Sequence, residues 1–301
     1  MARLFKPGHC TFTRILVSSI PMPAPNDIAF NRPIKAVRRA IAPWLPSILI
    51  LVLCHMDGMS LWAQASRPTW TPAFRQMRTQ IETLYFSYDA KAKQTLLKEA
   101  TTLIEHYPGT WQPNYYAALV NIQLGNIVRA DDKKLAYGYF RKALQHIHAA
   151  RTQSPNAENT LVLADVYGKL ASLKTIKVLY YGSRSKSFLK QAFKLNPNSP
   201  KNHLIAGIEI MWTPGIFRGS KKRAREFLNK ALLLEKTWQE PDPLTVQWAT
   251  RAEICAHLAQ LEILGHKPAK ARQYIDQALQ LVPDYGFIHR DILPQLVQLK
   301  K

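Results

Sequence analysis

One short pattern recurs along the chain and constrains its fold more than any other feature. Small or aliphatic residues stand at offsets 0, 4 and 7, and in four of the five copies a proline follows at offset 12. The first three positions lie on one face of an α-helix, where small side chains let a second helix approach closely. The proline cannot continue the helix and forces a turn. The copies are Ala143, Ile147, Ala150 and Pro155; Ala271, Ile275, Ala278 and Pro283; Ser185, Leu189, Ala192 and Pro197; Ala224, Leu228 and Ala231, with Lys236 in place of the proline; and the weakest, Leu96, Ala100, Leu103 and Pro108.

In chain order, the copy that begins at Leu96 comes first. Each of the other four copies follows another segment with helical apolar periodicity. These segments cover residues 114–124, 159–173, 202–212 and 251–264. A helix that repeatedly follows another helix across a short turn predicts antiparallel pairs stacked in series. We therefore expect an all-α domain over residues 66–301. Its predicted units are 73–108, 111–155, 158–197, 200–236 and 245–283, with a closing helix over 286–300.

The chain resembles the tetratricopeptide repeat (TPR) family. The resemblance is carried by these sets and by small or aromatic residues on the first helices, namely Ala164, Tyr167, Gly168, Ala206 and Gly207. The resemblance covers most of residues 73–286. Proline-to-proline spacings of 47 and 42 residues exceed the family's usual period of about 34, and the extra residues fall between paired helices. The resemblance implies an α-solenoid of about five antiparallel helix pairs with a C-terminal closing helix.

Two segments resemble a narrower group, the poorly characterised exported bacterial TPR proteins. They are MWTPGIFRGSKKRAR, residues 211–225, and ALQLVPDYGFIHRDILPQL, residues 278–296. The group commonly has two adjacent glycines where this chain has Gly219 and Ser220. This resemblance implies a binding or assembly role and no known reaction.

The N-terminal 65 residues have the layout of a secretory signal peptide. Lys35, Arg38 and Arg39 precede an apolar run over 41–54, and Ala63-Gln64-Ala65 forms a small-x-small cleavage site. The run would span about 21 Å as a helix, short of a ~30 Å hydrocarbon core. We expect residues 1–65 to be a signal peptide with an over-long N-terminal extension, cleavage after Ala65, and export, most simply to the periplasm. The alternative is an uncleaved membrane anchor.

The charge balance points to anionic partners without choosing among them. The chain has 41 basic and 20 acidic residues and a formal charge of +21. Such a surface suits nucleic acid, anionic lipid or acidic polymers. Export argues against nucleic acid, which leaves an anionic envelope component as one expected partner and a protein or peptide as the other. Membrane contact is expected only through an uncleaved leader.

Signals for catalysis and metal binding are weak. The sequence contains no GxSxG, GxxxxGK[ST], HExxH or GxGxxG motif. His146 and His148 stand two residues apart on a predicted helix and do not share a face. The three cysteines lie far apart and form no CxxC pair, and Cys255 sits in an apolar helix where burial is expected. We expect no enzyme activity, no cofactor and no metal.

The first helices of stacked pairs usually line the concave side of a solenoid, where partners bind. Aromatic and arginine residues make good interface anchors. The alternative is that the tyrosines pack the helix pairs together. The predicted binding residues on this face are Tyr115, Asn121, Tyr167, His203 and Arg251.

The segment 211–225 reads as a corner between two helices. Pro214 and Gly215 end the first helix, and Ser220 is placed to cap a second helix that begins near Lys221. Trp212, Ile216 and Phe217 are predicted to pack the corner down. The cations Arg218, Lys221, Lys222 and Arg223 stand at a helix N-terminus, which makes them a candidate anion site.

The features together favour an exported, non-catalytic protein-interaction or assembly scaffold in the cell envelope. Two alternatives stay open. One is a periplasmic solute-binding or transport-accessory protein that encloses a small ligand between repeats. The other is a basic module that binds anionic envelope polymers.

Overall fold

The computed structural model describes residues 71–173 and 176–299. The chain divides into two units, Met1–Ser66 and Arg67–Lys301, and all described residues belong to the second. The predicted signal peptide lies outside the described residues. In the part that is described, all regular secondary structure is helical.

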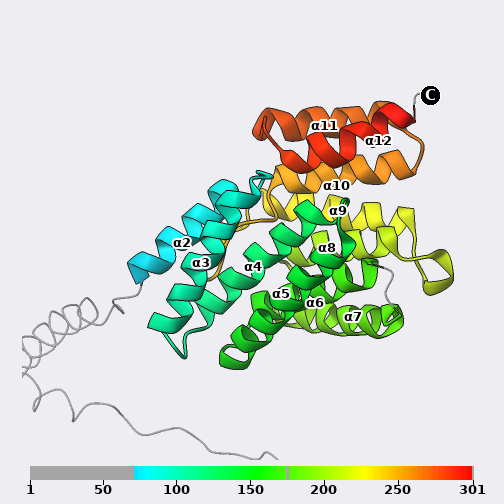
Figure 1. The fold of residues 1–301 in the computed structure, drawn as a ribbon. Coiled ribbons are helices and arrows are strands. Elements are labelled where there is room, and N and C mark those ends of the chain that lie inside the picture. The colour runs from blue at the N-terminus through cyan, green and yellow to red at the C-terminus, as the bar shows by residue number, and fades with distance from the viewer. Residues whose placement is uncertain (1–70, 174–175, 300–301) are drawn as a thin grey trace, which may run out of the picture. The chain divides into compact units, whose positions relative to one another are not determined.

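Among the described residues, ten helices form five consecutive pairs, each packed mainly against its own partner and the neighbouring pair (Figure 1). A π-helical turn and a last short helix close the C-terminal end. The predicted all-α, TPR-like architecture is therefore confirmed. The pairs are α2 (Thr71–Leu84) with α3 (Ala90–His106), α4 (Trp111–Val128) with α5 (Lys133–Gln153), α6 (Ala157–Ser172) with α7 (Val178–Leu195), α8 (Pro200–Trp212) with α9 (Lys221–Glu235), and α10 (Arg251–Leu264) with α11 (Pro268–Leu281), followed by η2 (Ile288–Ile292) and α12 (Leu293–Gln298).

The recurring pattern forms the seam within each pair. In α11, Ala271, Ile275 and Ala278 are fully buried, and the matching residues of α5 and α9 are fully buried as well. Space at the seam is tight: a Cβ added to Gly207 of α8 would lie 2.7 Å from the Leu228 side chain of α9. The offsets 0, 4 and 7 thus place small or aliphatic residues where two helices touch.

At the α8–α9 corner the predicted helix end and N-terminal cap are confirmed, and the predicted packing of three side chains is not. α8 ends at Trp212, a short 3₁₀ turn η1 (Gly215–Phe217) follows, and the Ser220 side chain accepts from the Arg223 amide at the start of α9. The predicted inward packing of Trp212, Ile216 and Phe217 is wrong. The three side chains are instead 51%, 86% and 48% exposed, and those of Trp212 and Phe217 border a cavity.

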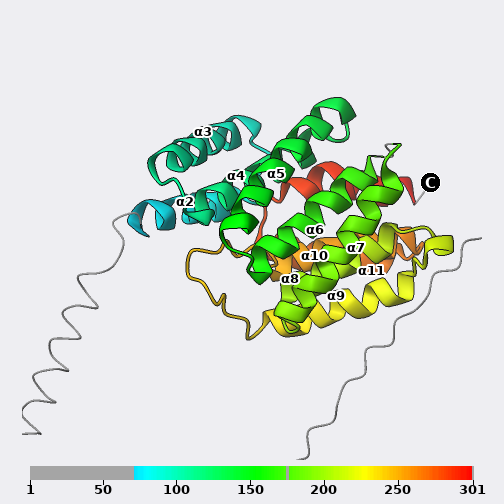
Figure 2. The same cartoon turned by 90° about the horizontal axis from the view of Figure 1, so that it is seen from below.

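A segment without helix or strand, residues 238–250, joins α9 to α10 and makes a turn at residues 242–245 (Figure 2). We call it the strap. Its side chains Leu244, Val246, Trp248 and Ala249 are buried. The fifth pair consequently begins at Arg251, since residues 245–250 belong to the strap.

Backbone atoms of the strap are held by side chains from three different first helices. The Arg78 guanidinium of α2 donates to the Pro243 carbonyl at 2.7 Å, and Glu82 accepts from the Gln247 amide at 2.7 Å. Tyr116 of α4 donates to the Leu244 carbonyl at 2.7 Å. Lys201 of α8 donates to the Val246 carbonyl at 2.8 Å. The strap is therefore fixed to α2, α4 and α8 through its main chain.

The turn between α2 and α3 contacts the C-terminal segment. The Gly286 amide donates to the Phe86 carbonyl at 2.9 Å, and the rings of Phe86 and Tyr285 meet edge to face at 4.8 Å between centroids. Tyr88 donates to Asp291 at 2.7 Å. The first and last units of the domain are thus directly joined. We call these contacts the terminal junction.

Candidate binding pocket

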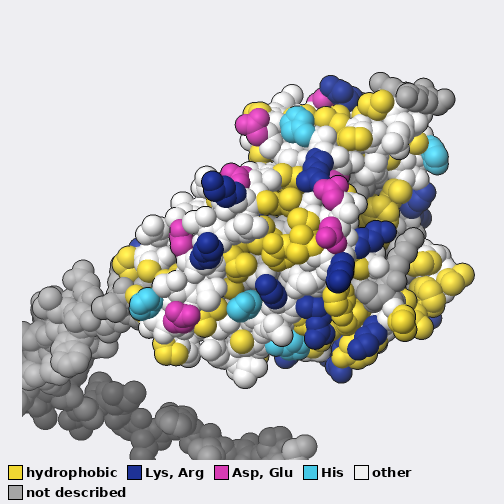
Figure 3. All heavy atoms as spheres, viewed as in Figure 1, with side chains coloured by type: hydrophobic (Ala, Val, Ile, Leu, Met, Phe, Trp, Pro, Cys, Tyr) yellow, Lys and Arg dark blue, Asp and Glu magenta, His cyan; other side chains and the backbone are white. Residues whose placement is uncertain are grey.

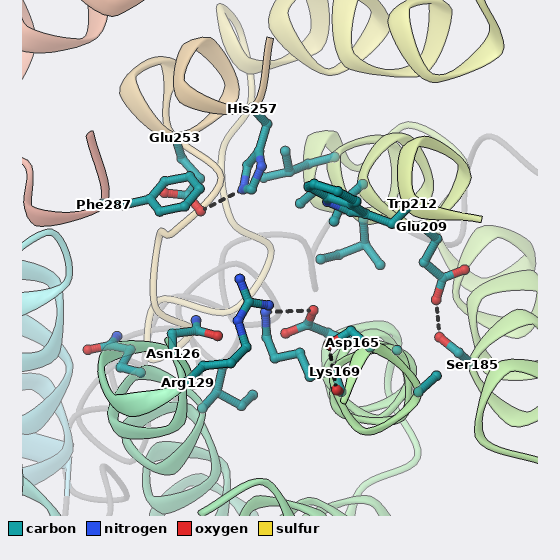
Figure 4. A pocket seen from close by; sticks show the side chains of 18 of the residues that line it. Asn126, Arg129, Asp165, Lys169, Ser185, Glu209, Trp212, Glu253, His257 and Phe287 are labelled. Carbon is teal, nitrogen blue, oxygen red and sulfur yellow. Dashed lines mark hydrogen bonds and ion pairs between the residues drawn. The ribbon is translucent and has the colours of Figure 1, made fainter. Parts of the chain in front are cut away.

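A cavity of about 390 Å³ lies between the first helices and the terminal junction (Figure 4). The C-terminal halves of α4, α6 and α8 form most of its wall, together with α10, the start of α7 and the strap residue Trp248. The N-terminal halves of the same first helices are covered by the strap. The inner face formed by the first helices is therefore divided in two: the strap covers one part, and the cavity borders the other.

Much of the cavity wall is apolar or aromatic. Such walls bury the body of a ligand, whereas a few polar groups set its orientation. The apolar and aromatic lining residues include Leu119, Ile122, Ile127, Val162, Leu204, Ile205, Ile208, Trp212, Phe217, Trp248, Tyr285 and Phe287, with Val178 and Leu179 at the start of α7.

Polar groups approach the cavity from two opposite sides (Figure 4). Asn126 and Arg129 come from the end of α4, and Asp165 pairs with Lys169 on α6 at 3.4 Å. On the opposite side the Glu253 carboxylate of α10 lies 3.3 Å from His257 Nε2. The cavity therefore offers charged groups of both signs around an apolar interior.

Glu209 of α8 lines the cavity beside Ser185 of α7. Burial raises the pKa of the Glu209 carboxyl to about 7. The Ser185 hydroxyl lies within reach of both Glu209 and the Ala164 carbonyl, the latter at 2.6 Å. One hydroxyl hydrogen cannot serve two acceptors. A protonated Glu209 resolves this, because it donates to Ser185 Oγ while Ser185 donates to Ala164.

Lys93 of α3 lies at another edge of the cavity, 1% exposed. Its ammonium group donates to the Leu84 carbonyl at 2.5 Å and to Gln123 Oε1 at 2.5 Å. Burial lowers the pKa of the Lys93 amine to about 7. This lysine ties the α2–α3 turn to α4 and so positions one wall of the cavity.

The strap is anchored by a buried ionic network. Lys201, which is fully buried, pairs with Glu158 at 3.1 Å and with Glu240 at 2.8 Å. Glu158 also accepts from Tyr115 at 2.7 Å and from the Trp248 indole at 2.9 Å. Each charge therefore has several partners, which is what a buried ion pair requires. The network fixes the strap, and with it the Trp248 wall of the cavity.

None of the five residues predicted for the concave face lines the cavity. Tyr115 and Asn121 are fully buried, as the packing alternative expects of the tyrosine. Tyr115 does lie under the inner face, but the strap covers it: its hydroxyl accepts from the Val246 amide at 3.3 Å. Asn121 donates within its own helix to the Ala117 carbonyl at 2.8 Å.

Tyr167, His203 and Arg251 contact neighbouring helices. Tyr167 stacks on Phe188 at 5.7 Å between ring centroids, and the His203 ring meets Phe193 at 5.0 Å. Arg251 pairs with Glu235 at 3.8 Å. Their role in binding stays a prediction.

The four cations predicted as an anion site all lie at the α8–α9 corner, and all are exposed. Lys221 donates to the Leu264 carbonyl at the end of α10. Arg218 has a left-handed backbone, with φ of 69°, which turns the chain into α9. The structure places the set together, and anion binding there stays a prediction.

Single-residue expectations for His146, His148 and Cys255 can be placed on the helices. His146 Nδ1 lies 3.1 Å from Asn114 Oδ1, and His148 Nε2 lies 3.2 Å from the Tyr167 hydroxyl. Cys255 is fully buried, as predicted, and burial raises the pKa of its thiol to about 11. In residues 71–173 and 176–299, no group of three or more His, Cys, Asp and Glu could hold a metal ion. None of the helices described there is long and apolar enough to cross a membrane.

Comparison with known structures places the architecture. A thermophilic TPR protein from Thermus thermophilus, TTC0263, superimposes with a TM-score of 0.52 at 19% identity, over 76% of this chain and 96% of that one. The fold is TPR-like. The HusA haemophore from Porphyromonas gingivalis superimposes with a TM-score of 0.50 at 16% identity, over 66% of this chain and 94% of that one. The sequence itself matches no family model and no curated protein.

The residues of this TPR-like pocket carry only faint sequence signals. Asp165 and Lys169 stand four apart on an otherwise apolar helix, a spacing that places both on one face. Glu209 is a lone carboxylate in the apolar segment 202–212. Both are visible as polar exceptions in buried helices. The contribution of Tyr285 and Phe287 is not visible, because it depends on the terminal junction.

Proposed function

We propose that the protein is a non-catalytic binding protein that encloses a small amphipathic ligand in the cavity. The observation that carries this proposal is the split inner face. An extended peptide crossing the first helices would meet the strap, which already occupies the N-terminal halves of α4, α6 and α8. The space left is about 390 Å³, a size typical of small-molecule sites.

The chemistry of the wall indicates the ligand class. An apolar or aromatic body fits against Ile208, Trp212 and Phe287, and polar or charged groups fit near Arg129 and Glu253. The TPR-like fold is compatible with holding a small molecule, since one of its structural neighbours is a haemophore.

A glycine in the cavity wall gives a direct test. A Cβ added to Gly182 of α7 would meet no atom within 4 Å, and the same holds for Gly138 of α5, which lies outside the cavity. We expect Gly182→Phe to fill space in the cavity and abolish ligand binding, whereas Gly138→Phe leaves it intact. Both variants should fold, because phenylalanine is a better helix former than glycine by a few tenths of a kcal/mol and neither site holds an atom within 4 Å of the new Cβ.

The measurement is native mass spectrometry of the protein purified from its own cell envelope, followed by thermal shift with the recovered molecule. A bound small molecule on the wild type and on Gly138→Phe, absent from Gly182→Phe, supports the proposal. Equal retention by both variants, or recovery of the wild type with a polypeptide partner and no small molecule, contradicts it.

A second candidate is the protein-interaction or scaffold role, which is common among TPR-like folds. The observation in its favour is the strap itself. The inner face already binds a segment of polypeptide, the strap. Tyr116 and Lys201 donate hydrogen bonds to its main-chain carbonyls. Crosslinking in the native envelope tests it, and a partner segment crosslinked to α4 and α8 is the expected result.

We propose in addition that the protein works outside the cytoplasm, in the cell envelope. The support is the order of basic residues, apolar run and Ala63-Gln64-Ala65 in the leader. The mature protein should begin at Ser66 and fractionate with the envelope. N-terminal sequencing that finds the leader retained would favour the membrane-anchor alternative.

A further inference from the structure

One edge of the domain carries an unusual concentration of exposed apolar side chains. Consecutive helices are antiparallel, so the start of α7, the end of α8 and the start of α9 lie at the same edge. Seven of the twelve large hydrophobic side chains that are exposed in the described residues belong to two short segments there. They are Ile176, Val178, Leu179, Tyr180, Trp212, Ile216 and Phe217.

Cations surround this apolar set. Neither residues 176–190 nor residues 211–225 contain an acidic side chain, although 20 are spread over the chain. Figure 3 shows hydrophobic and basic side chains side by side over α7 and the α8–α9 corner. Arg225 is held by Glu262 at 2.7 Å, and the other nearby cations are exposed. The exposed cations are Lys177, Arg184, Lys186, Lys190, Arg218, Lys221, Lys222 and Arg223.

We propose that this apolar–basic edge docks on an anionic phospholipid membrane. Bulky apolar and aromatic residues enter the interfacial region of a bilayer, and lysine and arginine around them bind anionic headgroups. Ile216 in η1 and Leu179 in the first turn of α7 are 86% and 67% exposed, so both side chains are accessible for insertion. A protein partner would also cover apolar residues, but charges of a single sign fit a uniformly negative surface better than a mixed protein surface.

The edge and the cavity adjoin each other. Val178, Leu179, Trp212 and Phe217 also line the cavity. Docking would place the cavity beside the lipid surface, where an amphipathic ligand is concentrated. The docking proposal stands without the ligand, because the exposed side chains and the cations carry it alone.

The test is binding of the full chain to phosphatidylcholine vesicles with and without about 30 mol% phosphatidylglycerol. Leu179→Ser with Ile216→Ser and Phe217→Ser should weaken binding to the anionic vesicles about tenfold. Leu195→Ser with Leu233→Ser is the matched control, since these leucines are 54% and 57% exposed at the C-terminal ends of α7 and α9. It should bind as the wild type does. Arg218→Glu with Lys222→Glu should weaken binding at about 0.1 M salt and matter less at about 0.5 M.

A local readout separates this edge from any contact made by the leader. Lipids brominated in their acyl chains should quench a component of tryptophan emission that disappears in Trp212→Phe and persists in Trp238→Phe. Gly182→Phe should bind vesicles normally, which distinguishes failure here from failure of the ligand proposal. Wild-type binding by the triple serine variant, unchanged quenching in Trp212→Phe, or self-association through the edge in place of vesicle binding would each overturn the proposal.

Discussion

At the scale of single residues, the cavity contains an acid whose protonation is set by its surroundings. Glu209 is partly buried between α7 and α8, and its carboxyl shares Ser185 with the Ala164 carbonyl. Its pKa of about 7 means that the folded protein binds this proton more tightly than the unfolded chain does. The stability contributed by the protonated form is fully present below pH 4.5 and is lost as pH rises to about 7.

We therefore expect Glu209→Gln to flatten the pH dependence of stability. Near pH 4.5 the variant and the wild type should unfold at similar urea concentrations. Above pH 7 the variant should be more stable by about 1–3 kcal/mol, because it never carries the buried charge. Urea unfolding at about pH 5 and about pH 8 measures the difference. An equal difference in stability between the variant and the wild type at the two pH values would show that the Glu209 carboxylate is adequately solvated.

Lys201 has a different part, since it holds two carboxylates together. Removing one member of a buried ion network leaves uncompensated charge and destabilises by about 3–5 kcal/mol. Lys201→Met should have this effect by leaving Glu158 and Glu240 facing each other. Lys169→Met is the control, because its pair with Asp165 is partly exposed and worth less than about 1 kcal/mol. Comparable losses in the two variants would contradict a structural role for the network.

At the scale of elements, the recurring pattern predicted the helix pairs because it records direct helix contacts. Ala143, Ala224 and Ala271 are buried for the reason the pattern implies. The capping of α9 by Ser220 was predicted for the same reason, since a cap is a contact between near neighbours in sequence. The exposure of Ile216 and Phe217 was not, because it depends on the geometry of the turn between two helices. Hydrophobicity alone favoured burial and was misleading there.

The corner itself depends on Gly219. A Cβ at this position would lie 1.6 Å from the Thr213 carbonyl oxygen, whereas one at Gly215 would meet nothing within 4 Å. We expect Gly219→Ala to destabilise the protein by about 1–3 kcal/mol, because the turn must open to admit the methyl group. Gly215→Ala should be close to neutral. Thermal unfolding of the two variants tests this, and equal melting temperatures would refute the tight turn.

At the scale of the molecule, the terminal junction changes what the solenoid can do. In an open array each unit contacts only its neighbours. Here Phe86 and Tyr285 pack together although they lie in the first and last units, and the strap joins α2, α4 and α8. Neither could be predicted from sequence, because repeat patterns report neighbours and not returns of the chain. For the same reason the sequence did not indicate that the strap covers Tyr115.

A substitution at Gly286 should reveal the junction. A Cβ there would lie 2.6 Å from the Tyr88 ring, so Gly286→Ala should push the C-terminal segment away from the α2–α3 turn. We expect faster amide hydrogen exchange in η2 and also in residues 85–89, with α6 unchanged. Gly138→Ala, whose Cβ meets nothing within 4 Å, is the control. Faster exchange confined to η2 and α12 would indicate an open array.

The junction also bears on how such a chain can change in length. A linear solenoid grows or shrinks by whole repeats, since duplication of one unit only moves the end. Here an inserted pair would separate the Gly286 amide from the Phe86 carbonyl and remove the cavity wall made by Tyr285 and Phe287. The repeat number is consequently tied to the cavity, and duplication of one helix pair, an ordinary route of change for repeat proteins, would break the junction and the cavity wall together.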